Sequence, residues 1–266
     1  MLQLRQIRKT FYPETPNEKK AIKNLSLTLN DGDFVTIIGS NGAGKSTLLN
    51  LVAGVLFPDD GEIHIDHKNL TWLPEFKRSK WIGRVFQDPM AGTAPNMTIE
   101  ENLALALGRT QQRSLKKGVG RKRRVEFQEH LQSLDLGLED RLTTKVGLLS
   151  GGERQALSLL MATFTQPRIL LLDEHTAALD PARAELITKI TEQVIQKYHL
   201  TTLMVTHNME QALQLGNRMI MMDDGEIIFE ANEEEKNNLT IPDLMEKFAK
   251  LRGRQMANDR ALLQMN

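Results

Sequence analysis

A glycine-rich loop that ends in a lysine and two hydroxyl residues is the part of this sequence best suited to chemistry. It reads Gly39-Ser40-Asn41-Gly42-Ala43-Gly44-Lys45-Ser46-Thr47 and matches the pattern G-x-x-x-x-G-K-[ST]. Glycines let backbone N–H groups curl around an anion, and the lysine can reach the β- and γ-phosphates of a nucleotide. The Ser46 hydroxyl can bind Mg²⁺, and a helix that opens at Thr47 adds the favourable field of its N-terminus. The loop therefore predicts a bound nucleoside triphosphate.

Two adjacent acids form the second candidate. Asp173 and Glu174 follow the apolar run Ile169–Leu172, which predicts that they stand at the carboxyl end of a buried strand. A metal-binding acid needs that position in a nucleotide-hydrolysing α/β protein. A Ser-Gly-Gly segment, Leu149 to Gln155, precedes the run by a short distance.

The elements expected to position these residues alternate along the chain. Strand-like runs occur at Phe34–Ile38, Ile169–Leu172 and Leu203–Val205, with helix-length segments between them. This alternation predicts a parallel sheet covered by helices. Two N-terminal runs instead alternate between apolar and polar residues, and they predict an antiparallel β-layer. Their apolar members are Leu2, Leu4, Ile7, Leu25, Leu27 and Leu29.

The middle of the chain is helical in pattern, from Asn96 to Leu148. One helix is expected to begin at Thr98, and a second is marked by Val125, Phe127, Leu131 and Leu134. Near the C-terminus, two apolar runs joined by Asp223-Asp224-Gly225 predict a hairpin, and the polar sequence beyond Thr240 is expected to be helical.

Composition excludes several classes of protein. The 266 residues suit one domain or one domain with a subdomain. The 34 acidic and 34 basic residues balance, so the overall charge gives no reason to expect nucleic acid as a partner. There is no cysteine, which excludes a disulfide, a thiolate nucleophile and a cysteine-bound zinc. The N-terminus does not resemble a secretory signal, and the apolar runs fall short of the roughly 20 residues that span a bilayer.

Together the glycine-lysine loop, the Leu149–Glu153 segment and the two acids resemble the ATP-binding cassette (ABC) ATPase family. The resemblance covers about residues 2 to 230, and Glu153 stands where the family signature commonly has Gln. It implies an α/β fold with a P-loop NTPase (RecA-like) core and parallel sheet, an antiparallel β-layer and an inserted helical subdomain.

Within a single domain at 1–266, the resemblance places the core and β-layer at 1–87 and 158–230. The helical subdomain with the signature is expected at 88–157, and a C-terminal helical tail at 231–266. ATP and Mg²⁺ are the implied ligands.

Site residues follow from the same resemblance. Glu174 is expected to be the general base, assisted by His207, Gln87 and Lys45. Ser46, Gln87 and Asp173 are expected near Mg²⁺. The residues expected to bind the nucleotide are Phe11, which would stack on adenine, Gly39, Ser40, Asn41, Gly42, Ala43, Gly44, Lys45, Ser46, Thr47, Ser150, Gly151, Gly152 and Asp180.

In the family the signature faces the ATP that the opposite subunit holds, with Asp180 at the dimer interface. The resemblance therefore implies a homodimer that drives a separate integral-membrane permease, with a separate substrate-binding protein and no nucleic acid. The expected location is the cytoplasmic face of the cell membrane, through the permease. Among ABC proteins, the chain resembles the tryptophan/tyrosine-type uptake systems related to the branched-chain amino-acid importers.

Two other classes remain open from the sequence. One is the ATPase of an exporter or lipid-extraction complex, and the other is a non-transport ABC ATPase that acts on ribosomes or chromosomes. Ribosome-acting forms normally carry two cassettes and chromosome-structuring forms carry a long coiled coil, and this chain shows neither.

Three further features have alternative interpretations. His175 replaces the proline usual after the two acids and could tune Glu174 by hydrogen bonding. The basic run Arg113, Lys116, Lys117, Arg121, Lys122, Arg123 and Arg124 is either a solvated face or a contact with a permease or anionic lipid. His64 and His67 lack a suitable third ligand nearby and do not predict a metal site.

Overall fold

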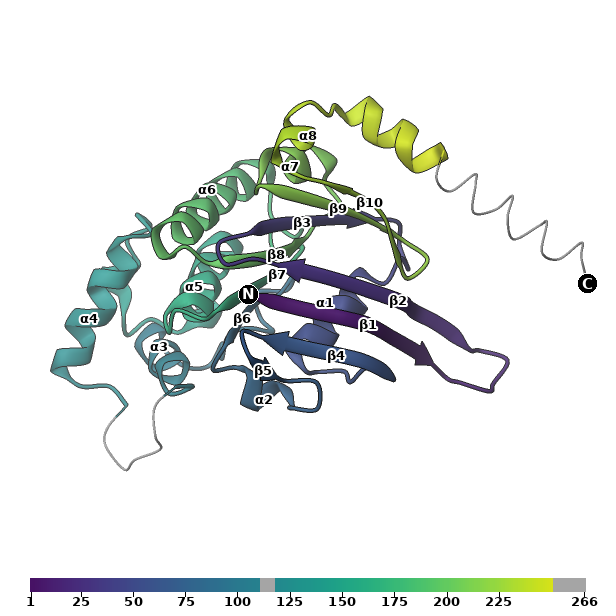
Figure 1. Cartoon of the computed structure of the whole chain (residues 1–266). Helices are drawn as coiled ribbons and strands as arrows, with labels where there is room; N and C mark the ends of the chain where they lie inside the picture. The colour runs from purple at the N-terminus through teal and green to yellow at the C-terminus, as the bar shows by residue number, and fades with distance from the viewer. Residues whose placement is uncertain (111–117, 251–266) are drawn as a thin grey trace, which may run out of the picture.

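Two sheets and a set of helices make up the chain (Figure 1). The computed structural model describes residues 1–110 and 118–250. The larger sheet has six strands in the order β10-β9-β3-β8-β7-β6. Strands β3 (Phe34–Gly39), β8 (Thr201–Val205), β7 (Ile169–Asp173) and β6 (Ile82–Val85) run parallel, as does β9 (Arg218–Asp223) beside β3.

Both faces of the central parallel strands are buried. Ile169, Leu170, Leu171 and Leu172 are all fully shielded from solvent, and β8 is buried along its whole length. A near-continuous apolar run is typical of a strand that helices cover on both sides. The predicted parallel sheet is confirmed.

The smaller sheet is the predicted antiparallel layer, with the order β2-β1-β4-β5. It contains β1 (Leu2–Phe11), β2 (Lys19–Leu29), β4 (Asp60–Ile65) and β5 (Lys68–Asn69). Its inward apolar side chains pack on helix α1 (Lys45–Ala53) and on one face of β3 and β7, in one common cluster. The layer and the parallel sheet therefore hold α1 between them.

The inserted helices pack on the other face of the parallel sheet. They are α3 (Ile99–Leu107), α4 (Arg121–Gln132) and two short 3-10 turns at Leu138–Arg141 and Val146–Leu148. Helix α5 (Gly151–Thr163) joins them to the sheet, with α6 (Pro181–Tyr198) beside it.

Details of these helices differ from the sequence pattern. Helix α3 begins at Ile99, one residue after the expected Thr98, which caps it: Oγ1 of Thr98 accepts from the N–H of Glu101, and the Thr98 N–H donates to the Glu101 carboxylate. Helix α4 begins at Arg121, and Val125 is exposed although the pattern grouped it with buried Phe127 and Leu131. The expected boundary between residues 157 and 158 falls inside α5.

The last part of the described chain completes the larger sheet. The predicted hairpin is confirmed as β9 and antiparallel β10 (Glu226–Ala231). Three short helices are α2 (Glu75–Arg78), α7 (Met209–Gln214), which packs on β3, and α8 (Glu233–Asn237), and residues 241–250 are helical. The predicted tail beyond residue 250 lies outside the described residues. Within 1–110 and 118–250, no helix is both long and apolar enough to cross a membrane.

Candidate functional site

The glycine-rich loop connects β3 to α1, and its backbone requires glycine at two positions. Gly39 has φ 155°, and a Cβ there would lie 2.1 Å from the carbonyl oxygen of Met222. Gly44 has φ 101°, and a Cβ there would lie 2.5 Å from the carbonyl oxygen of Ala21. Strands β9 and β2 thus approach the loop too closely for any side chain, which fixes its path.

Helix α1 begins at Lys45, two residues before the expected Thr47. Its N-cap is Gly44, which supplies no side-chain hydrogen bond, and its first turn contains no acid. The first N–H groups of this helix therefore have no side-chain cap and can bind an anion.

Lys45 is buried within the loop itself. Its Nζ donates to the carbonyl oxygens of Gly39 at 2.7 Å and Ser40 at 3.0 Å. Burial lowers the pKa of Lys45, and the nearby carboxylates of Glu174 and Asp173 oppose that shift. The ammonium group thus lies inside the curve of the loop.

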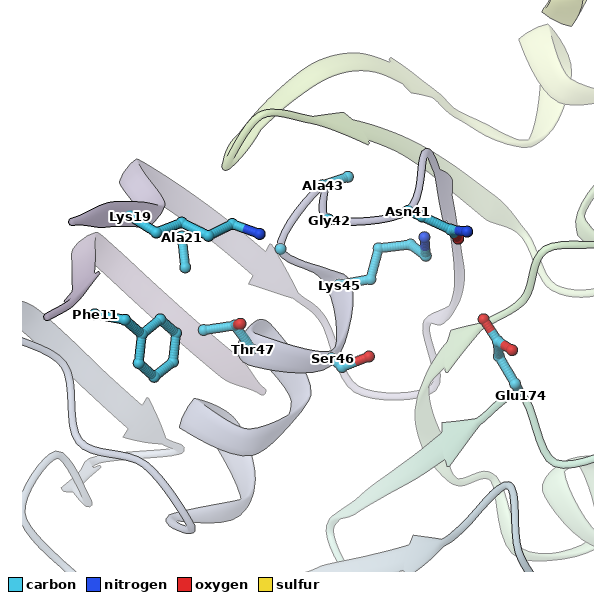
Figure 2. A pocket seen from close by; sticks show the side chains of 11 residues that line it. Phe11, Lys19, Ala21, Asn41, Gly42, Ala43, Lys45, Ser46, Thr47 and Glu174 are labelled. Atoms are coloured by element: carbon cyan, nitrogen blue, oxygen red, sulfur yellow. The ribbon is translucent and has the colours of Figure 1, made fainter. Parts of the chain in front are cut away.

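An open cavity of about 250 Å³ lies over the loop. Figure 2 shows the Phe11 ring beside Thr47 at one side of the loop and the Glu174 carboxylate facing the loop from the other. The residues that line the cavity are Phe11, Lys19, Ala21, Asn41, Gly42, Ala43, Gly44, Lys45, Ser46, Thr47 and Glu174. Lys19 and Ala21 of β2 were missed by the sequence analysis, because an alternating edge strand carries no motif.

Asp173 ends β7 beside this cavity but does not line it. Its Oδ2 accepts a hydrogen bond from Nη2 of Arg84 at 2.9 Å, and both side chains are largely buried. Sequence reasoning missed Arg84, although it lies three residues before Gln87. Gln87 itself is exposed and does not line the cavity.

Glu174 is held in an unusual backbone conformation at the turn after β7. Its φ is 45°, and its N–H donates to the carbonyl oxygen of Val205 at 2.9 Å. The carboxylate Oε2 lies 3.3 Å from Nδ1 of His207, so the structure brings these two predicted residues together. Glu174 also borders a second cavity, which His207 lines.

A hydrogen-bonded glutamine supports the His207 loop. Gln211 of α7 accepts from Oγ1 of Thr206 at 2.8 Å, and its Nε2 donates to Thr188 at 3.1 Å and Thr176 at 3.3 Å. The loop that carries His207 is thereby tied to the segment after Glu174 and to α6. No motif in the sequence indicated this glutamine.

The Ser-Gly-Gly segment forms a different helix start, at α5, and it does not line the cavity. Oγ of Ser150 accepts from the N–H of Glu153 at 3.3 Å, and the Glu153 carboxylate accepts from the N–H of Ser150 at 2.7 Å. Arg141 pairs with the same carboxylate at 2.6 Å. Burial raises the pKa of Glu153, but the bonds from Ser150 and Arg141 outweigh it and hold that pKa below its ordinary value.

The remaining predicted residues lie around these two helix starts. Oγ of Ser40 donates to Asp223 at 2.5 Å, which joins the loop to the end of β9. Asp180 caps α6 by accepting from the N–H of Arg183. Neither Asp180 nor Gly39 and Ser40 lines the cavity at the loop.

The hypothesis that His175 tunes Glu174 by hydrogen bonding is wrong. The imidazole is buried, with Nε2 3.1 Å from Oγ1 of Thr191 on α6 and Nδ1 without a hydrogen-bond partner. Burial lowers the pKa of His175 to about 4. His175 is thus a neutral side chain of the core, behind the acid it follows.

Other polar groups named from the sequence have ordinary partners or fall outside the described chain. Nε2 of His64 lies 2.9 Å from the Glu62 carboxylate. Of the basic run, Arg113, Lys116 and Lys117 lie outside the described residues. Arg124 pairs with Glu100 at 2.6 Å through its Nε.

Comparison with known proteins agrees with this geometry. The chain matches the ABC transporter family over residues 22–177. It is 45% identical to a tyrosine transport ATP-binding protein of Clostridioides difficile, over 93% of this chain and 98% of that protein. It is 33% identical to the xylose/arabinose import ATP-binding protein XylG of Sulfolobus acidocaldarius, over 94% and 95% respectively.

Solved structures of ATP-binding cassettes share the fold. The post-hydrolysis dimer of the cassette MJ0796 bound to ADP and Pi has a TM-score of 0.75 at 32% identity, covering 88% of this chain and 99% of that one. The ADP conformation of the cassette MJ1267 has a TM-score of 0.76 at 29% identity, covering 94% and 98%. The predicted P-loop NTPase fold, with its parallel sheet and antiparallel layer, is confirmed. The chain therefore belongs to the ABC transporter family, as an ATP-binding cassette that binds and hydrolyses ATP.

Proposed function

We propose that this chain is the ATPase subunit of an uptake transporter, in which two copies close on two ATP molecules and drive a separate permease. The observation that carries the proposal is the uncapped start of α1, with Lys45 beneath it and Glu174 facing it across one cavity. Triphosphate at the loop would take the N–H groups of α1 and the Lys45 ammonium, and Phe11 would contact the base.

The oxygen donors at the loop fit Mg²⁺. Hydroxyl and carboxylate groups such as Ser46 and Asp173 are its preferred protein ligands. Within the described chain, no group of three His, Cys, Asp or Glu side chains could hold a metal alone. Phosphate oxygens would therefore have to complete the coordination, and Gln87 would approach from the end of the core segment that leads into the helical subdomain. When bound, Mg²⁺ neutralises the charge of the β- and γ-phosphates.

Lys45, Glu174 and His207 have separate roles in phosphate binding and hydrolysis in this proposal. Lys45 would exchange the carbonyl oxygens of Gly39 and Ser40 for phosphate oxygens, which costs little movement because the ammonium already lies inside the loop. The Glu174 carboxylate would take the proton of the attacking water, and His207 would hold that carboxylate in place. The backbone strain at Glu174 is consistent with a residue fixed for chemistry.

A second copy would complete the site. Ser150, Gly151 and Gly152 start α5 outside the cavity of their own chain, so in this proposal they face the ATP of the partner, with Asp180 at the interface between copies. The dimeric structure of MJ0796, at 31% identity and a TM-score of 0.74, supports a paired arrangement.

An exposed apolar surface supports contact with a permease. Trp72 and Phe76 are 67% and 72% exposed, and Phe57 lies 5.9 Å from Trp72 between ring centroids. The Phe57–Trp72 pair is thus an exposed aromatic contact, with exposed Phe76 nearby in the sequence, and exposed apolar patches mark surfaces that bind other proteins. The chain would thus act at the cytoplasmic face of the membrane, through the permease, with a separate substrate-binding protein delivering the cargo.

The substrate class rests on the relatives. The C. difficile relative is a tyrosine transport protein, and the more distant S. acidocaldarius relative serves sugar import. At 45% against 33% identity, the comparison favours an amino acid, and we propose an aromatic one.

The test is co-expression of the tagged chain with a membrane protein proposed to be its permease, purification of the complex and reconstitution in liposomes. ATP-dependent uptake of tyrosine, with xylose not transported, is expected. Replacing Trp72 and Phe76 together by serine should reduce recovery of the complex, whereas replacing the equally exposed Tyr12 should not. Recovery of the chain only with ribosomes or nucleic acid would refute the transport assignment.

A further inference from the structure

A largely buried arginine side chain lies next to the acid assigned to the metal. Arg84, in β6, is 11% exposed, and its Nη2 donates to Oδ2 of Asp173 at 2.9 Å. Its Nη1 donates to Oδ1 of Asn50 in α1 at 2.8 Å. The guanidinium group thus connects the strand that ends in the acid with the helix that follows the phosphate loop.

Two further observations set this arginine apart from a purely structural one. Its Nε is buried without a hydrogen-bond partner, a cost that a residue selected only for packing would avoid. Its Cζ also lies 4.7 Å from the centre of the Phe86 ring, directly before Gln87. Arg84 therefore touches the acid, the loop helix and the segment that leads into the inserted helices.

The charge next to Asp173 bears directly on cation binding. A guanidinium at hydrogen-bond distance neutralises the carboxylate, and it repels a divalent cation that approaches the same group. Both side chains are shielded from solvent, so water screens this repulsion only weakly.

We propose that Arg84 is a positioning residue that serves as the counter-ion of Asp173 in the nucleotide-free chain and opposes divalent-cation binding there. The site would then accept a cation only together with the triphosphate, whose negative charge outweighs the arginine. This inference rests on the proposed function, because that function assigns Asp173 to the metal.

The test measures binding of Mn²⁺, as a probe of the cation site, by electron paramagnetic resonance. The Arg84 and Arg8 variants are compared with the wild type in the nucleotide-free state, and Asp173→Asn is compared with a saturating non-hydrolysable ATP analogue present. Arg84→Met is expected to bind Mn²⁺ about fivefold tighter or more, because the repelling charge is gone. Arg84→Lys keeps the charge and should bind Mn²⁺ as the wild type does. Arg8→Met removes an exposed arginine that pairs with Asp60 and should leave the affinity unchanged.

A structural role predicts the opposite result, since a disturbed site binds the cation more weakly. Unchanged or weaker Mn²⁺ binding by folded Arg84→Met would overturn the inference. Asp173→Asn separates the two proposals: it should weaken Mn²⁺ binding by roughly tenfold or more if Asp173 serves the metal. If Asp173→Asn binds normally, the metal assignment fails. If Asp173→Asn binds Mn²⁺ more weakly as expected but Arg84→Met binds it with wild-type affinity, the inference about Arg84 fails and the metal assignment stands.

Should Arg84→Met not fold, the wild-type protein gives an answer by NMR of its arginine side chains. The Arg84 guanidinium signals, identified by their loss in Arg84→Lys, should change when Mg²⁺ is added to the ADP-loaded protein and stay constant with ADP alone. Signals that do not respond to Mg²⁺, while Mg²⁺ binding is seen calorimetrically, would also overturn the inference.

Discussion

The starts of α1 and α5 are both preceded by glycine or serine and both resemble anion sites, yet they differ in what satisfies them. At α1 the cap is Gly44, with no side-chain bond and no acid in the first turn. At α5 the cap is Ser150, and Glu153 completes a reciprocal capping box. One helix start is open to a ligand, whereas the other is satisfied by its own chain.

This difference indicates how each of the two helix starts would bind phosphate. The open start can bind an anion without breaking a side-chain cap, because its N–H groups have no side-chain competitor. The capped start already holds a carboxylate, which Arg141 balances. A phosphate brought by a second copy would have to share Ser150 with Glu153. Binding at α1 should therefore precede and outweigh binding at α5.

The largest expected effect concerns the acid that faces the open start. Glu174→Gln removes the proposed base and should lower ATP turnover roughly 100-fold or more while ATP still binds. Steady-state hydrolysis and nucleotide binding, measured on the same preparation, check both parts. Glu185→Gln, which changes another acid at the neighbouring cavity, should hydrolyse ATP normally. Hydrolysis by Glu174→Gln at the wild-type rate would remove this residue as the base.

The next effect tests the open start itself. Lys45→Ala removes the ammonium inside the loop and should weaken ATP binding by roughly 10- to 100-fold, as expected for a charged hydrogen bond. Lys19 also lines the cavity but comes from β2, so Lys19→Ala should have a smaller effect. Equal affinities for Lys45→Ala and the wild type, in an equilibrium titration, would contradict the assignment of the loop.

A smaller effect is expected at the capped start. Ser150→Ala should cost about 1 kcal/mol of stability through loss of the cap. It should also lower turnover, because the partner's phosphate loses a hydroxyl. Thr98→Ala removes the same kind of capping box from α3 and is the matched control. If both variants lose stability equally and both keep full turnover, Ser150 serves only as a cap.

The two helix starts also show what sequence could predict. The loop pattern led to Lys45 and Ser46, and the apolar run that ends in two acids led to Glu174, because each belongs to a short motif with a fixed spacing. Arg84, Lys19 and Gln211 belong to no motif, and they reach the site only because strands and helices distant in sequence pack together. The wrong hypothesis about His175 has the same origin, since adjacency to Glu174 does not reveal that its ring points toward Thr191.

Lowering the pH should reduce the free energy of unfolding in different pH ranges through His175 and through Glu153. His175 follows Glu174, the acid that faces the open start, and burial holds its pKa near 4, below the value of 6.5 for an unfolded chain. The unfolded state therefore binds the extra proton first as the pH falls. The contribution of neutral His175 to the free energy of unfolding is fully present above pH 6.5 and is lost as the pH drops from there toward 4. The loss should approach about 1.4 kcal/mol for each pH unit.

Glu153, at the capped start, behaves differently because its folded pKa lies below the ordinary value of 4.5. The contribution of the Glu153 carboxylate to the free energy of unfolding is present above pH 4.5 and is lost only as the pH falls below that value. Urea unfolding at pH 7.5 and 5.5 should therefore show a loss for the wild type that is smaller in His175→Gln and retained in Glu153→Gln. Some loss remains in His175→Gln because burial also lowers the pKa of His130. If His175→Gln loses as much stability as the wild type over this pH range, the buried imidazole does not titrate as its surroundings imply. The acid sensitivity then comes from other residues.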